Sequence, residues 1–251
     1  MHCAVHHMKY GILGDIHANL NALRSVLAAL DAEGVDEVVS VGDVVGYGAA
    51  PRECLHLLLE RKVRIVMGNH DAAAVGLLPI DNFNPAAAFA ARWTATQLSP
   101  EERSYLAHLP LRLEYEHILV AHATWDAPER FDYIMSSTDA EPSLALQPRR
   151  VCFIGHTHRP LLVGRLRDEI NRTFWTHDTR VDLSEWQRVL VNVGSVGQPR
   201  DDDPRAAVAV YDTESELYSL LRVPYDIERE QQRILRAGLP PILAERLALG
   251  F

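Results

Sequence analysis

The stretch KYGILGDIH, residues 9–17, begins as a short apolar strand and ends in a turn that carries Asp15 and His17. Asn19 follows as a helix cap, and leucines over about 20–30 repeat with the helical period. Strands over 37–41 and 63–67, with a helix over 51–62 between them, continue the pattern. Alternating strands and helices predict βαβ units and a largely parallel sheet.

The pattern changes after residue 74. Two helices with proline at the first helical position predict a helical insertion over about 75–109, beside the sheet. A hairpin over 111–121 follows, and the polar, proline-dotted stretch 123–150 is expected to be a long surface loop. The remaining short strands are expected to complete a second, mostly antiparallel layer, at 151–154, 160–166, 189–193, 206–211 and 217–223. Two short helices over 226–249 end a single domain of residues 8–251.

Composition and charge narrow the function classes. With 47% hydrophobic and 24% charged residues, the chain is an ordinary globular protein. Its formal net charge of -9 disfavours non-specific nucleic-acid binding, because an acidic surface repels polyanions. A protein of this charge that acts on phosphates needs local positive charge, which bound divalent metal ions would supply.

The sequence favours a reducing cytoplasm and no membrane. The cysteines form neither a disulfide framework nor a thiolate cluster, and Cys54 and Cys152 are expected to be buried. There is no apolar run of ~20 residues and no apolar signal-peptide core. We interpret residues 1–7 as a disordered extension or a wrongly assigned start before Met8, and we exclude its histidines from the chemistry: His2, His6 and His7.

Oxygen and imidazole donors follow the ends of the predicted strands. They are Asp15, His17, Asp43, Asn69, His70, Asp71, His122, His156 and His158. Each alone has a simple explanation, such as a helix cap or a turn. Ligands of open α/β sheets bind outside the carboxyl ends of the strands, so together these side chains predict one site. The donor set contains no cysteine, which suits borderline-to-hard divalent ions.

Ordered motifs in this set resemble a known family. They are Gly14-Asp15-Ile16-His17, Gly42-Asp43-Val44-Val45-Gly46, Gly68-Asn69-His70-Asp71, His122 and Gly155-His156-Thr157-His158. Together they resemble the motifs of the calcineurin-like metallophosphoesterase superfamily, and residues 192–200 resemble its small bacterial and archaeal, YfcE-like phosphodiesterase branch. Ala121 and Ala123 stand beside His122 where that family often has glycine, so a change in metal geometry stays open.

The resemblance implies the fold class α/β: a four-layer α-β-β-α sandwich of two mixed sheets flanked by helices, with a helical insertion. It implies a first metal held by Asp15, His17 and His158, and a second held by Asn69, His122 and His156. Asp43 would bridge both, since adjacent dications ~3.5–4 Å apart need a shared anion.

The neighbours of the metals would bind substrate and move protons. His70 is the expected general acid, and Asp71 is expected to orient it through its other ring nitrogen; the alternative for Asp71 is a simple turn former. Arg200 and Tyr47 are candidate substrate-binding residues. A salt bridge of Arg200 with residues 201–203, and a packed loop position for Tyr47, are equally open.

We therefore predict a dinuclear-metal phosphoesterase, with phosphodiesters preferred, that cleaves small-molecule phosphate esters by attack of a metal-bound hydroxide. A phosphoprotein phosphatase and a dinucleoside polyphosphate hydrolase are alternatives on the same centre. A non-catalytic scaffold is disfavoured because every ligand position is intact. Two divalent ions are expected, with manganese preferred and iron, zinc, nickel or cobalt open. Specificity is expected to rest on residues 75–109 and 123–150; the oligomeric state is not readable from the sequence.

Overall fold

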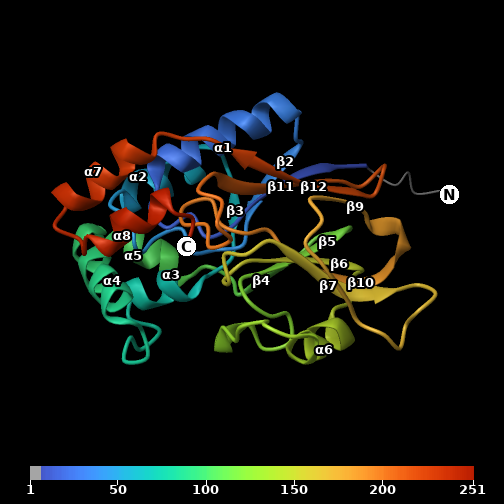
Figure 1. The fold of residues 1–251 in the computed structure, drawn as a ribbon. Helices are drawn as coiled ribbons and strands as arrows, with labels where there is room; N and C mark the ends of the chain where they lie inside the picture. Colours follow the sequence, from blue (N-terminus) through green and yellow to red (C-terminus); the bar gives the residue numbers. More distant parts are fainter. Residues whose placement is uncertain (1–6) are drawn as a thin grey trace.

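The computed structural model describes residues 7–251, which form two six-stranded mixed sheets packed face to face with helices outside them (Figure 1). The first sheet has the order β3 (Arg64–Ile65), β2 (Glu37–Ser40), β1 (Lys9–Leu13), β11 (Ala206–Asp212), β12 (Leu217–Val223) and β9 (Arg180–Asp182). The second has the order β4 (Arg112–Glu114), β5 (Ile118–Ala121), β6 (Val151–Ile154), β10 (Trp186–Asn192), β7 (Leu161–Leu166) and β8 (Phe174–Thr176). The predicted α-β-β-α sandwich is confirmed.

The βαβ units of the first sheet form as the sequence predicts. Strands β1, β2 and β3 run parallel, joined by α1 (Leu20–Glu33) and α2 (Pro51–Glu60). The Asn19 side chain accepts a hydrogen bond from the backbone N–H of Ala22 at 3.0 Å, which caps α1. The leucines of helix α1 pack against the first sheet.

The prediction of which strands form the second sheet is wrong for two of them. Strands β11 and β12 belong to the first sheet, where β11 pairs antiparallel with β1. The sequence of a strand shows the alternation of its apolar residues but does not show which strand it pairs with. The sequence pattern of a single strand therefore cannot assign it to one of two sheets. Strand β9, short and largely exposed, was not predicted either.

The core lies between the two sheets. Ile12 and Val39 of the first sheet pack in one buried cluster with Val120, Phe153 and Val191 of the second. Further apolar clusters lie between each sheet and its outer helices. In Figure 1, α1 lies over the first sheet and α6 (Ser137–Leu146) under the second.

The two helices predicted for residues 75–109 are present as α4 (Pro85–Gln97) and α5 (Pro100–Ala107). Helix α5 begins with the predicted capping box, in which Ser99 and Glu102 exchange side-chain to backbone hydrogen bonds. An additional short helix, α3 (Asn69–Ala74), begins within the third motif.

The stretch 123–150 is not the long loop that its composition indicates. It contains the 3-10 turn η1 (Pro128–Arg130) and helix α6, which has Pro142 inside it. Ala140 and Leu144 are buried against the second sheet, and this tertiary packing offsets the backbone hydrogen bond that proline cannot donate. Proline was therefore a misleading signal here.

The C-terminal helices α7 (Ile227–Arg236) and α8 (Ile242–Glu245), with the 3-10 turn η3 (Arg246–Ala248), pack against Tyr47 and α4. No helix in the described range 7–251 is long and apolar enough to cross a membrane. Cys54 and Cys152 are buried, as predicted. The predicted N-terminal extension falls almost wholly on residues 1–6, outside the described residues; His7 is exposed.

Candidate metal centre

The donor side chains stand where strands of both sheets end. Asp15, Asp43 and His156 directly follow or lie close after β1, β2 and β6. These residues, with His17 and His158, have positive φ angles between 48° and 69°. Left-handed backbone costs a non-glycine residue about 1–2 kcal/mol, and such strain gathers at functional sites. The strained turns direct the side chains across the sheet edge toward one another.

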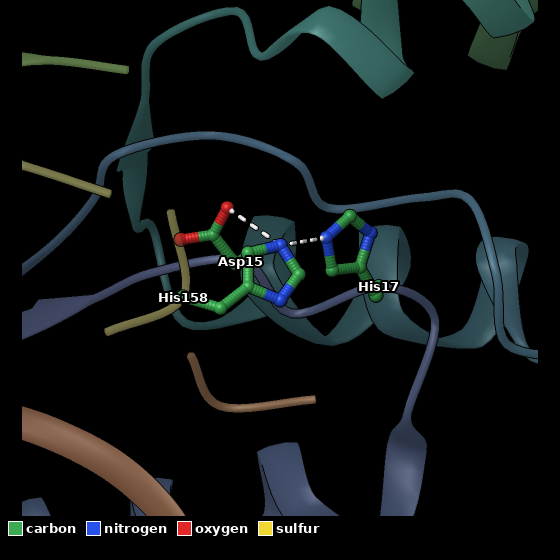
Figure 2. Close-up of side chains that lie close together, drawn as sticks. All are labelled: Asp15, His17 and His158. Atoms are coloured by element: carbon green, nitrogen blue, oxygen red, sulfur yellow. Dashed lines mark hydrogen bonds and ion pairs between the residues drawn. The ribbon is translucent and has the colours of Figure 1, made fainter. Parts of the chain in front are cut away.

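The first group consists of Asp15, His17 and His158 (Figure 2). The Nε2 atoms of His17 and His158 lie 3.0 Å apart, and an Asp15 oxygen lies 3.4 Å from Nε2 of His158. All three side chains are buried. Their nitrogen and oxygen lone pairs converge on one point, as the ligands of a cation do.

The second group consists of Asn69, His122 and His156. Its donor atoms lie close together around Nε2 of His122. This atom lies 3.0 Å from Oδ1 of Asn69 and 3.2 Å from Nδ1 of His156. Nδ1 of His122 lies 2.8 Å from the Val41 carbonyl, so it carries the ring hydrogen and donates it there. Nε2 therefore presents a lone pair to an amide oxygen, which also presents lone pairs. A cation between them would satisfy both atoms.

Asp43 stands between the two groups. Its Oδ2 lies 3.6 Å from Nε2 of His17 and 3.4 Å from Nε2 of His122, and its Oδ1 accepts a 2.8 Å hydrogen bond from the backbone N–H of His70. One carboxylate oxygen thus lies within reach of both groups. The expected convergence of these distant residues on one edge is confirmed.

Electrostatics favour the neutral forms of these groups when no cation is present. Burial raises the pKa of Asp43 to about 7, and burial followed by the nearby Asp43 raises that of Asp15 well above its usual value. Burial lowers the pKa of His122 to about 4 and, together with neighbouring cationic groups, lowers those of His17, His156 and His158. The unprotonated imidazoles are already in the form that binds a divalent metal ion, and the charge of such an ion would favour the carboxylate forms of Asp15 and Asp43.

His70, which follows Asn69 in the sequence, lies beside the candidate metal centre. Its ring packs against Tyr47 at a centroid distance of 4.3 Å, and against Phe83 at 5.0 Å. Burial, then the charge of Arg200, lowers the pKa of His70 to about 3, so the ring is neutral here. A bound phosphate anion would favour its protonation.

The expected pairing of Asp71 with His70 is wrong. Both Asp71 oxygens accept backbone hydrogen bonds, one from Val45 and one from Gly68, each at 3.1 Å, and Nδ1 of His70 has no hydrogen-bond partner within residues 7–251. Asp71 occupies the third position of α3, from which a carboxylate reaches back to the helix start. It therefore holds the loops that carry Asp43 and Asn69, which is the turn-former alternative.

Arg200 and Tyr47 lie together at the mouth of the first group. The Arg200 guanidinium donates to Oε1 of Gln198 at 3.0 Å and lies 5.7 Å from the centre of the Tyr47 ring. Tyr47 packs against His17 with ring centroids 4.6 Å apart. The carboxylates of Asp201 and Asp203 pair instead with Arg222 and Arg205, so Arg200 has no carboxylate partner among the described residues.

The alanines beside His122 do not enter the site. Ala121 and Ala123 are buried in two different apolar clusters, and both methyl groups therefore pack into the core. The departure from glycine leaves the His122 ring free to meet Asn69 and His156.

A cleft of about 440 Å³ leads away from the second group. Besides Asn69, His70 and His156, it is lined by aromatic side chains of the insertion and of the stretch 123–150, namely Phe83, Phe131 and Tyr133. Both segments are those on which specificity was expected to rest. The individual residues were missed because no local pattern marks them.

A buried set of nitrogen and oxygen donors at the edge of a two-sheet sandwich defines a candidate metal-binding site in an α/β protein. Residues 8–216 match the family model of the calcineurin-like phosphoesterase superfamily domain. The chain is 33% identical over 243 residues to an uncharacterised protein of Methanocaldococcus jannaschii, covering 95% of this chain and 97% of that one. The chain belongs to the calcineurin-like phosphoesterase superfamily.

Solved structures agree with this assignment. The chain is similar to a metallophosphoesterase from Sphaerobacter thermophilus, at 38% identity and a TM-score of 0.84 over 98% of this chain and 100% of that one. A hypothetical protein from Pyrococcus horikoshii has the same fold, at 19% identity and a TM-score of 0.78 over 97% and 98% of the two chains. The protein is therefore a metal-dependent hydrolase of phosphate esters.

Proposed function

We propose that this chain is a two-metal phosphodiesterase. Its first metal would be held by Asp15, His17 and His158, its second by Asn69, His122 and His156, with Asp43 shared. The observation that carries the proposal is the position of Asp43, whose single Oδ2 lies 3.6 and 3.4 Å from the Nε2 atoms of the two groups. A carboxylate placed between two lone-pair clusters suits a pair of cations better than one.

The residues around the centre would each do one part of the reaction. When bound, a pair of divalent ions makes a water more acidic and neutralises charge on the phosphate. Asn69 places His70 next to the bound phosphate, where the imidazole can give a proton to the leaving oxygen. Arg200, which has no carboxylate partner among residues 7–251, can pair with a phosphate oxygen. Burial of the donors keeps other water away from the reacting atoms.

Room beside the centre supports a diester as substrate. The cleft of about 440 Å³ can hold the organic group that a diester keeps on phosphorus while its other ester group leaves. Manganese is the ion we propose, with iron, zinc, nickel or cobalt as alternatives, because donors of this kind accept each of them. The buried free thiols of Cys54 and Cys152 support a cytoplasmic location.

The test is metal binding combined with hydrolysis. Protein stripped of metal and reloaded with manganese should bind about two ions per chain by calorimetry and hydrolyse bis-p-nitrophenyl phosphate. Asp43→Ala should abolish hydrolysis, whereas the matched control Asp31→Ala, at a surface ion pair with Arg61, should not change it. A reloaded protein that binds no divalent metal would contradict the proposal.

A further inference from the structure

We propose that the ester group retained in the cleft is a nucleoside, so that the substrate is a nucleoside phosphodiester. This inference rests on the proposed phosphodiesterase function and adds to it the class of substrate. It is drawn from the walls of the cleft, which are aromatic on the sides contributed by two separate segments of the chain.

One aromatic wall comes from the insertion. Phe83 lies just before α4, is partly buried, and packs with its ring centroid 5.0 Å from that of His70. It therefore forms part of the cleft wall next to His70. A planar group attached to the phosphate would meet this ring.

The other wall comes from the segment after η1. Tyr133 stacks on the ring of His156 at 3.9 Å with an interplanar angle of 28°, yet remains 53% exposed. Phe131, at the end of η1, has a positive φ of 53°, a costly conformation for an aromatic residue. Phe131 also packs in an apolar core cluster, so Tyr133 is the ring of this wall that leaves exposed aromatic surface at the cleft.

The cationic lining residue of the cleft already has an anionic partner. Arg130, the one arginine lining the cleft, is paired with Asp132 at 2.8 Å. Asn82 adds a side-chain amide that can both donate and accept. Stacking faces with a neutral amide match a nucleobase, which has a planar π-face and polar edges. A second phosphate or an acidic peptide would find no unpaired cation among the lining residues.

The experiment compares esters that release the same leaving group. Manganese-loaded protein is given the p-nitrophenyl esters of thymidine monophosphate, phenyl phosphate and methyl phosphate, and kcat and KM are measured for each. The thymidine ester should have a kcat/KM about tenfold or more above that of the methyl ester, mainly through KM, and above that of the phenyl ester. Calorimetry should likewise show thymidine monophosphate binding more tightly than methyl phosphate.

Variants then locate the effect in the cleft. Tyr133→Leu and Phe83→Leu should each lower kcat/KM for the thymidine ester about fivefold to a hundredfold, the range for one stacked base, and should lower kcat/KM for the methyl ester by a smaller factor. Phe89→Leu is the matched control, because Phe89 is an exposed aromatic residue of α4 that does not line the cleft. Tyr133 is exposed enough that its replacement should not prevent folding.

Different failures remain distinguishable. If none of the esters is hydrolysed, the proposed function itself fails. If all are hydrolysed equally, or if both variants slow every ester alike, the nucleoside inference is overturned while the phosphodiesterase stands. A phenyl ester as good as the thymidine ester would also overturn it, because the cleft would then select any aromatic ring.

Discussion

The Nε2 atoms of His17 and His158 lie 3.0 Å apart although neither has a hydrogen to offer the other. The Nδ1 atom of His17 donates to the Val45 carbonyl, and that of His158 to the Gln198 carbonyl. Two lone pairs therefore face each other at a buried site. This arrangement costs free energy in the metal-free protein, and a cation between the nitrogens removes the cost.

Manganese should therefore stabilise the fold. At a free concentration one hundred times its Kd, we expect a gain of about 2.7 kcal/mol in the free energy of unfolding, seen as a higher Tm. His17→Ala should lose part of this gain and lower the bound metal. His108→Ala, at an exposed histidine after α5, serves as control. Full metal content in His17→Ala would count against the first group.

Replacing His70 tests the proton donor. His70→Ala should keep the metal content, because the ring is not among the proposed ligands. Turnover of diesters with alkyl leaving groups should fall by about a hundredfold or more, and that of p-nitrophenyl esters much less, since p-nitrophenolate leaves without a proton. Equal slowing of both kinds of ester would exclude the general-acid role.

Gly46 tests whether the position of His70 matters. Its φ is +90°, and a Cβ there would lie 2.6 Å from Nδ1 of His70. Gly46→Ala should displace the ring and destabilise the fold by about 1–3 kcal/mol. Turnover of alkyl esters should fall with metal content unchanged. The control is Gly76→Ala, because Gly76 also has positive φ but has no atom within 4 Å of an added Cβ.

Glu230 gives a pH-dependent prediction away from the ligands. It is fully buried, accepts a 2.7 Å hydrogen bond from Asn21, and its Oε1 has no hydrogen-bond partner in the part of the chain that the structure describes. Burial raises its pKa above the usual 4.5, so the folded state holds this proton to higher pH than the unfolded chain does. The contribution of Glu230 to stability therefore falls as pH rises from about 4.5 through the folded pKa.

Glu230→Gln should remove this loss. We expect the variant to be more stable than the wild type by about 1 kcal/mol at pH above the folded pKa, with the difference shrinking toward acid pH. Denaturant unfolding at several pH values measures it. A difference that stays constant with pH would mean that Glu230 does not titrate across that range.

Several elements could be predicted because their signals are local. Asn19 with the following leucines predicts α1, and Ser99 with Glu102 predicts the start of α5; both caps are present. Helix α6 was harder to predict, because Pro142 argues against it; Ser136 caps its start, and packing on the second sheet stabilises it. Asp71 shows the same limit, since its acceptance of backbone hydrogen bonds from Gly68 and Val45 depends on how the loops meet.

The sequence by itself determined the donor set and its chemistry, because residue types and their positions after strands are properties of the chain. It also determined the βαβ units, whose periodicity is short-range. Only the tertiary structure decided that β11 joins β1, that Asp43 lies between His17 and His122, and that Phe83 and Tyr133 line one cleft. Those relations join residues far apart in the chain, and they arise from the packing of two sheets rather than from any local pattern.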